Sequence, residues 1–203
     1  MSLPPLPLRP SRAAMSRRTR ARLAVVLAGC IVAIVAAALL LALFPRSAEA
    51  LLPVGAAAPA FTLHTTGGGT VSLQRLRGKA VLLEFCASWS AQCVAEMPVL
   101  NRLRGLSPGT LVYVNGDSED EASVASFGRS FKARVPLALD QGPTTVSFPD
   151  HGPRGPVTAR YRVTVFPTFY VIDLHGRVAW RAVGGQPAAL LARELRRASR
   201  SVP

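Results

Sequence analysis

The sequence predicts an α/β domain with a mixed β-sheet flanked by helices, preceded by a single transmembrane helix. Apolar runs typical of buried strands, at 80–83 and 111–114, alternate with helical patterns. This order is expected of a sheet joined by crossover helices. An uncharged stretch at 23–44 is long enough to cross a bilayer.

The length of the chain fits one globular domain with an N-terminal appendage. The 203 residues carry a formal net charge of +13, and six arginines within residues 1–22 contribute much of it. Only two of the 24 basic residues are lysines, and no motif combines basic with interleaved aromatic residues. We therefore predict no nucleic-acid partner.

The N-terminal segment has the charge pattern of a membrane anchor. Arginines crowd the N-terminal flank of residues 23–44, whereas only Arg46 follows closely, and positive charge marks the cytoplasmic side. The protein is therefore expected in the cell membrane, crossing it once with its N-terminus in the cytoplasm. The predicted parts are a cytoplasmic tail at 1–22, an anchor at 23–44, a linker at 45–60 and an extracytoplasmic domain at 61–203.

Two alternatives to an uncleaved anchor stay open. Residues 48–50 could form a signal-peptidase site, although the apolar stretch is longer than usual for a signal peptide. Residues 27–30 resemble a bacterial lipobox, in which Cys30 would be lipidated. The apolar run continues well past Cys30, which favours the uncleaved anchor.

The first half of the domain has local signals for each element. Alternating residues at 61–63 and 70–73 surround three glycines and predict a hairpin. The apolar run at 80–83 predicts a central strand over 80–85, and a helix should follow from about 92 to 105. Pro98 lies inside that helix and should kink it.

The second half continues in the same way. Ser118 and Glu121 form a capping-box pattern that should open a helix ending near Phe131. Residues 140–156, which include Asp150 and His151, are rich in proline and glycine and predict a long loop. The remaining predicted elements are strands at 111–114, 135–139 and 178–183, a short helix at 157–161, and a last helix from about Pro187 that buries Leu191, Leu195 and Ala198.

One segment, Phe85 to Pro98 with the sequence FCASWSAQCVAEMP, joins the central strand to its helix. Cys93 should therefore lie in or near the first turn of that helix. The carboxyl end of a central strand is the place where open α/β sheets carry out their chemistry.

This segment resembles the active-site segment of the thioredoxin-like superfamily, most closely the membrane-anchored TlpA/ResA-type redoxins. Their pattern reads F-W-A-S-W-C-x-x-C-x-x-E-M-P. Ser90 stands where the pattern has its attacking cysteine, and Cys86 stands where it has a tryptophan. The resemblance spans roughly residues 54–199. It implies a thioredoxin-like fold, thiol-disulfide oxidoreductase activity without a cofactor, and protein thiols or disulfides as partners, including those of cytochrome maturation.

The resemblance also implies the roles of three residues. In the superfamily the first cysteine attacks as a thiolate at a helix N-terminus, and the second resolves the mixed disulfide. A serine cannot form a disulfide, so Ser90 and Cys93 are not a redox pair. Glu84 aligns with the buried acid beneath the second cysteine, and strand alternation puts Cys86 on the same side as Glu84. We predict that Cys93 and Cys86 form a relocated disulfide above Glu84, although Glu84 could instead be a strand-end residue with a satisfied partner.

A second part of the site comes from the loop before the next strand. Residues 165–173 resemble the superfamily's cis-proline loop, which implies that Pro167 lies against the site. Phe166 and Trp89 would frame a substrate groove there, or would simply pack. The three histidines show no ligand spacing with the cysteines, so we predict no metal site.

Two other functions compete with the oxidoreductase. One is a redox-inactive binding module that keeps the groove but has lost the nucleophile. The other is a peroxidase using Cys93, because Ser90, Cys93 and Glu96 also resemble the T/S-x-x-C…E signature of the related AhpC/TSA peroxiredoxins. That signature has a proline at the position of Cys86, which counts against the peroxidase.

Overall fold

The computed structural model describes residues 51–106, 109–142 and 154–200. The predicted anchor, Asp150 and His151 therefore lie outside the described residues. Within the described ranges no helix has the length and apolarity needed to cross a membrane.

The described residues form a seven-stranded sheet in the order β2-β1-β5-β4-β3-β6-β7. Strands β3, β4 and β5 are parallel, whereas β6 pairs antiparallel with β3 and β1 pairs antiparallel with β5. The predicted mixed sheet with flanking helices is thus confirmed. The strands are β1 (Thr62–Thr65), β2 (Thr70–Ser72), β3 (Val81–Cys86), β4 (Thr110–Asn115), β5 (Leu137–Leu139), β6 (Thr168–Ile172) and β7 (Val178–Val183).

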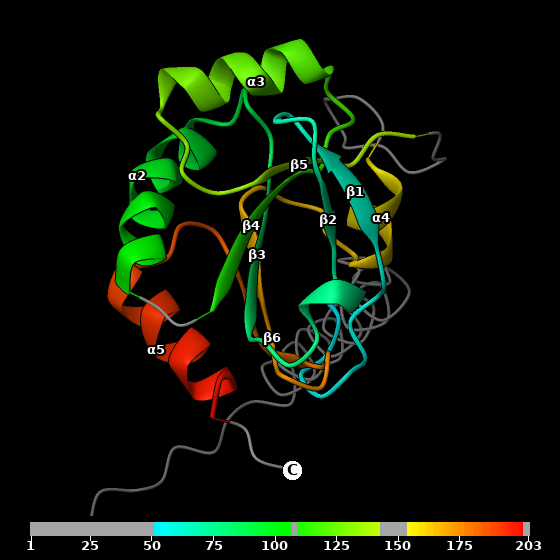
Figure 1. Cartoon of the computed structure of the whole chain (residues 1–203), viewed down its shortest axis with the longest axis vertical. Helices are drawn as coiled ribbons and strands as arrows, with labels where there is room; N and C mark the ends of the chain where they lie inside the picture. Colours follow the sequence, from blue (N-terminus) through cyan, green and yellow to red (C-terminus); the bar gives the residue numbers. More distant parts are fainter. Residues whose placement is uncertain (1–50, 107–108, 143–153, 201–203) are drawn as a thin grey trace, which may run out of the picture. The chain divides into compact units, whose positions relative to one another are not determined.

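Helices cover both faces of this sheet (Figure 1). Helix α2 packs beside α5 on one face, and α3 packs against β5. The short α4 lies on the opposite side of the sheet from α2. The helices are the 3-10 turn η1 (Gln74–Leu76), α2 (Ala91–Leu106), α3 (Glu121–Ser130), α4 (Pro156–Arg160) and α5 (Ala188–Ala198).

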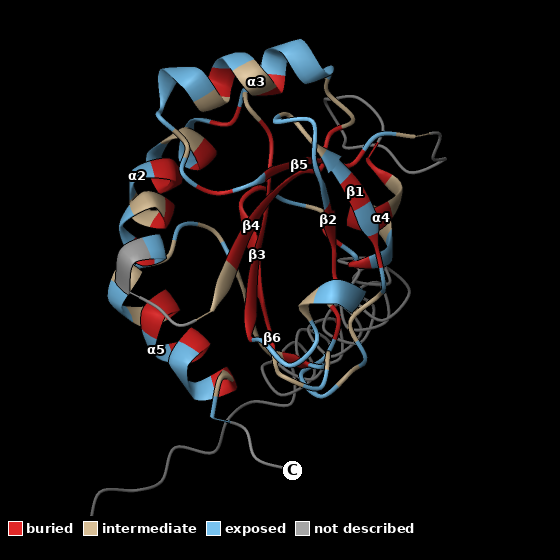
Figure 2. Ribbon diagram, in the orientation of Figure 1, coloured by how far each residue is buried: buried red, intermediate tan, exposed pale blue. Residues whose placement is uncertain are grey.

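Strand β3 is buried at every position because it has a neighbouring strand on each side and helices on both faces (Figure 2). Its side chains alternate between those faces. Phe85 packs on the rings of Tyr161 and Tyr170, with centroid distances of 5.0 and 6.0 Å. Glu84 and Cys86 consequently point to the other face, toward α2.

Helix α3 begins differently from the prediction. Its N-cap is Asp120, whose side chain accepts a hydrogen bond from the backbone N–H of Ser123 at 2.9 Å. Ser118 has a φ of 53°, which is not helical, and lies between β4 and α3. The predicted capping box at Ser118 and Glu121 is therefore wrong, because the cap lies two residues further along the chain.

The domain also begins earlier than predicted. Leu52 is buried, its N–H donates to the hydroxyl of Tyr170 at 3.1 Å, and Ala57 pairs with Arg177 beside β7. Residues 51–60, which we expected to belong to the linker, are thus packed on the domain. Only Leu52 among them is buried, and backbone hydrogen bonds with residues 176–178 hold the segment beside β7.

Other local predictions are confirmed. Helix α5 buries Leu191, Leu195 and Ala198, as its periodicity indicated. The peptide bond between Phe166 and Pro167 is cis. The cis-proline loop leads directly into β6, which pairs with the central strand, and so this loop meets the end of β3.

Candidate active site

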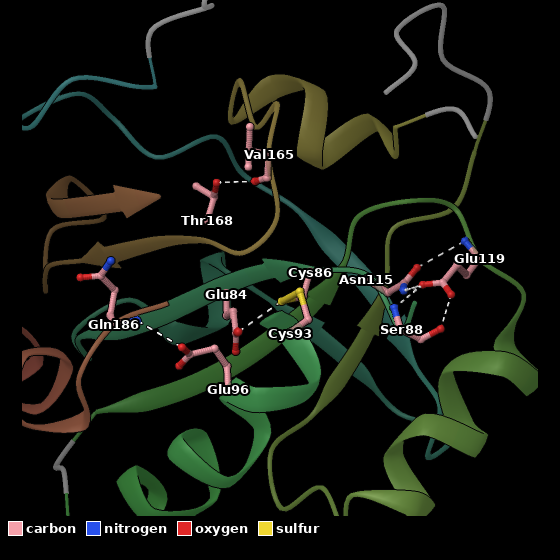
Figure 3. Close-up of a disulfide and its surroundings, with 10 residues drawn as sticks. All are labelled: Glu84, Cys86, Ser88, Cys93, Glu96, Asn115, Glu119, Val165, Thr168 and Gln186. Carbon is pink, nitrogen blue, oxygen red and sulfur yellow. Dashed lines mark hydrogen bonds between the residues drawn. A yellow bond between two sulfur atoms is a disulfide. The ribbon is translucent and has the colours of Figure 1, made fainter. Parts of the chain in front are cut away.

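A disulfide between Cys86 and Cys93 lies at the centre of the candidate site (Figure 3). Cys86 is the last residue of β3 and Cys93 is the third residue of α2, and their Cα atoms are 5.8 Å apart. The structure therefore contains the pairing predicted from strand alternation and the family pattern. Both cysteines have an exposed fraction of 0%.

Glu84 lies directly beside this disulfide. Its Oε1 atom is 3.2 Å from Sγ of Cys86, and its exposed fraction is 1%. Burial, and then the nearby charge of Glu96, raise the pKa of Glu84 well above its usual range. A disulfide sulfur carries no hydrogen, so in the oxidised protein the contact is favourable when Glu84 is neutral and donates its proton toward sulfur. The site thus favours a protonated carboxyl next to its sulfur atoms.

Removing this buried carboxyl should change how stability depends on pH. The native state keeps the proton of Glu84 to higher pH than the unfolded chain, whose glutamates titrate at about 4.3. The stability from this group is complete below that pH and is lost as pH rises toward the raised native pKa. We expect oxidised Glu84→Gln to match the parent in thermal unfolding at pH 4 and to exceed it at pH 8.

The control for this measurement is Glu121→Gln, because Glu121 is exposed on α3. The difference in unfolding temperature between this variant and the parent should be the same at pH 4 and pH 8. Equal unfolding temperatures of parent and Glu84→Gln at both pH values would show that Glu84 carries no unfavourable charge in the native state.

A second buried acid, Glu96 on α2, faces the same region. Its Oε1 accepts a hydrogen bond from the backbone N–H of Gln186 at 3.2 Å, and its Oε2 has no hydrogen-bond partner among the described residues. Burial raises the pKa of Glu96. Tyr113, which is paired with Glu84 across β3 and β4, is also buried there with no partner for its hydroxyl in the described part of the chain. Sequence analysis named Glu96 only in the peroxidase alternative, and it did not place Tyr113 in the site.

The turn that carries Ser88 is held by Glu119, which lies between β4 and α3. The Glu119 carboxylate accepts hydrogen bonds from the backbone N–H of Ser88 at 2.8 Å, from the Ser88 hydroxyl and from the side-chain amide of Asn115. Sequence reasoning missed Glu119, because it lies 31 residues from Ser88 and no local pattern marks it. This contact fixes the turn between the two cysteines to the end of the sheet.

The predicted groove residues gather at the same end of the sheet. Trp89 is 46% exposed, its indole N–H donates to Asp117 at 2.6 Å, and its ring centre lies 6.2 Å from that of Phe166. Phe166 precedes the cis Pro167. Ser90 is 8% exposed and stands immediately before α2. No cluster of three potential metal ligands occurs among the described residues.

Comparison with known proteins identifies the family to which this site belongs. The family model described as Redoxin matches residues 53–195, most of the chain. The chain belongs to the redoxin family. The matched region of this redoxin begins at residue 53, which agrees with the packing of residues 51–60 on the domain.

Individual relatives refine that assignment. A thiol-disulfide oxidoreductase ResA of Bacillus cereus is 28% identical over 137 residues, which cover 66% of this chain and 72% of the relative. The thioredoxin-like protein YneN of Bacillus subtilis is 33% identical over 126 residues, covering 60% of this chain and 66% of the relative. These relatives confirm the resemblance to TlpA/ResA-type redoxins and support the predicted class of activity, thiol-disulfide exchange.

Solved structures agree with the fold. A Chlorobium tepidum protein assigned as the thiol:disulfide interchange protein DsbE has a TM-score of 0.59 and 27% identity, covering 73% of this chain and 99% of its own. StoA from Bacillus subtilis has a TM-score of 0.56 at 21% identity, covering 68% of this chain and 96% of its own. The thioredoxin-like fold is therefore confirmed.

Proposed function

We propose that this redoxin exchanges disulfides with partner proteins through Cys86 and Cys93, in place of the two-cysteine motif of the family pattern. One observation carries the proposal: the two cysteines are bonded at the end of the central strand, with the Glu84 carboxyl 3.2 Å from one of their sulfur atoms. Disulfide exchange needs a sulfur pair, and a nearby group that gives and takes a proton assists it. The described residues supply both.

The overall reaction balances two electrons and two protons. Two thiols of a reduced partner become one disulfide, and the Cys86–Cys93 bond is cleaved to two thiols. The reverse reaction oxidises the redoxin and reduces a partner disulfide. The direction in the cell follows from the relative reduction potentials of the two pairs.

The rim of the site favours a protein as partner. Trp89, Val165 and Val183 are about half exposed, and they lie around Phe166 and the cis Pro167. Exposed apolar side chains grouped in this way indicate a contact surface for a polypeptide. Cysteine-containing segments of extracytoplasmic proteins, including those that mature cytochromes, are the substrates that we propose.

The proposal includes the location expected from sequence. The arginine asymmetry around residues 23–44 supports a single-pass anchor with the domain outside the cytoplasm. Disulfides persist in that compartment. A reporter fused after Pro203 that was active only in the cytoplasm would refute this orientation.

The test of the function uses the purified full chain in detergent, with Cys30→Ser so that only the site cysteines remain. We expect two thiols to appear on reduction and to disappear on reoxidation, with a mass change of two hydrogens. The reduced protein should then transfer its electrons to the disulfides of insulin. A disulfide that resists reduction in the folded protein, or reduced protein that transfers nothing, would refute the exchange.

One observation favours a second candidate, the redox-inactive binding module. Neither cysteine is exposed, which is typical of a disulfide that only stabilises a fold. In that case the apolar rim would still bind partners. The insulin assay separates the two candidates, because the module would bind without transferring electrons.

A further inference from the structure

The two sulfur atoms of the disulfide have different surroundings, and these differences separate their roles. We propose that Cys93 forms the mixed disulfide with the partner, and that Cys86 opens and closes the internal bond. The inference rests on the proposed function, because it assigns the steps of that exchange. It inverts the family pattern, in which the position of Cys93 belongs to the resolving cysteine.

Cys86 has the surroundings of an internal, proton-exchanging thiol. It ends the central strand, where its backbone is paired with Asn115 of β4. Oε1 of Glu84 lies 3.2 Å from its sulfur. A neighbouring carboxyl disfavours a stable thiolate at Cys86. The same carboxyl can donate a proton when this sulfur is the leaving group and accept one when it attacks.

Cys93 has the surroundings of a stabilised thiolate. It is the third residue of the 16-residue helix α2, so it lies within the first turn, where backbone N–H groups lack partners inside the helix. The positive end of the helix dipole favours negative charge on this sulfur. Ser90 is 8% exposed, stands three residues before Cys93, and follows Trp89, which is 46% exposed on the rim of the site.

The steps follow from this placement. A partner thiolate attacks Sγ of Cys93, the internal S–S bond breaks, and its electron pair goes to Sγ of Cys86. That sulfur takes the proton of neutral Glu84, so one thiol and one carboxylate form. The second thiol of the partner, after losing its proton to solvent, attacks the partner's own sulfur in the mixed disulfide. This releases the Cys93 thiolate and leaves the partner oxidised. The Glu84 carboxylate and the Cys93 thiolate then take up from solvent the two protons that the partner's thiols lost.

The charge state of Glu84 depends on the groups that face it. These are Glu96 from α2 and Tyr113 from β4, together with Cys86 on its own strand. Burial and the Glu96 charge raise the pKa of Glu84, which favours the protonated form of the carboxyl that lies 3.2 Å from Sγ of Cys86. In the reverse direction the Glu84 carboxylate takes the proton of Cys86 as that sulfur attacks.

The experiment compares two single-cysteine variants of the full chain in the Cys30→Ser background. Reduced Cys86→Ser and Cys93→Ser are mixed with dithionitrobenzoate, an aryl disulfide that releases a coloured thiolate. We expect Cys86→Ser, which keeps Cys93, to form its adduct at least about tenfold faster at neutral pH. Equal rates after unfolding in guanidinium would show that the difference arises from the fold.

A second measurement avoids both cysteine substitutions. Peptide mapping of the first adduct on the parent should place the probe on Cys93. Glu84→Gln should leave that first step unchanged and should slow the second release, in which Cys86 attacks. Faster trapping by Cys93→Ser, equal rates in the folded variants, or a first adduct on Cys86 would overturn the assignment while leaving the exchange intact. No reaction of either folded variant would refute the proposed function itself.

Discussion

Ser90→Cys is expected to raise the rate of insulin disulfide reduction by at least about tenfold over the parent. Ser90 immediately precedes α2 and is 8% exposed, whereas Cys93 is fully buried. A thiol at position 90 would therefore have the helix N-terminus beside it and a shorter path to the groove. Serine and cysteine are similar in size, so the turn held by Glu119 should tolerate the change.

The measurement uses the full chain with Cys30→Ser, reduced and then assayed at neutral pH. Ser126→Cys is the matched control, because Ser126 is exposed on α3 and adds a third thiol away from the site. It should leave the rate unchanged. If folded Ser90→Cys were no faster than the parent, the groove around the site would have lost the ability to present a disulfide to this position.

Gly155→Ala is expected to lower the free energy of unfolding by about 3 kcal/mol. A Cβ atom at this position would lie 2.1 Å from the carbonyl oxygen of Asp140 and 2.3 Å from its Oδ2. Asp140 cannot easily move away, because its carboxylate accepts hydrogen bonds from the N–H of Val157 and from the N–H and hydroxyl of Thr158. These bonds hold the first turn of α4 in place.

The control is Gly67→Ala, because a Cβ at Gly67 would meet nothing within 4 Å. It should change stability by no more than about 0.5 kcal/mol. The backbone of Gly155 has a φ of −62°, which any residue adopts, so the expected loss is steric in origin. Both variants are compared by denaturant unfolding followed by tryptophan fluorescence, and similar midpoints would show that the contact between Gly155 and Asp140 relaxes readily.

The sequence was most informative where signals are local. The central strand follows from its continuous apolar run, and α5 follows from the spacing of Leu191, Leu195 and Ala198. The pairing of Cys86 with Cys93 followed from two simple facts: side chains alternate along a strand, and the family pattern puts Cys93 above the acid. None of these inferences needs knowledge of distant contacts.

The sequence was least informative where contacts join distant segments. Glu119 and Ser88 are 31 residues apart, and Asp140 reaches the start of α4 across 17 residues. The predicted start of α3 was wrong for a different reason. Ser118 and Asp120 are both good capping residues, and only the backbone geometry shows which of them caps the helix. Residues 51–60 have the composition of a linker. Composition does not reveal that their backbone forms hydrogen bonds with residues 176–178 at the edge of the sheet.

The short ring closed by the disulfide links the state of the site to the lifetime of the protein. Cys86 and Cys93 are separated by 7 positions, and in the chain-entropy account a cross-link over so short a ring contributes about 2.5 kcal/mol by restricting the unfolded chain. Each reduction removes that restriction, so a reduced molecule unfolds more often than an oxidised one. Proteases that cut unfolded chains would then degrade the reduced form sooner. The supply of oxidant around the protein would therefore set its abundance as well as its readiness to react.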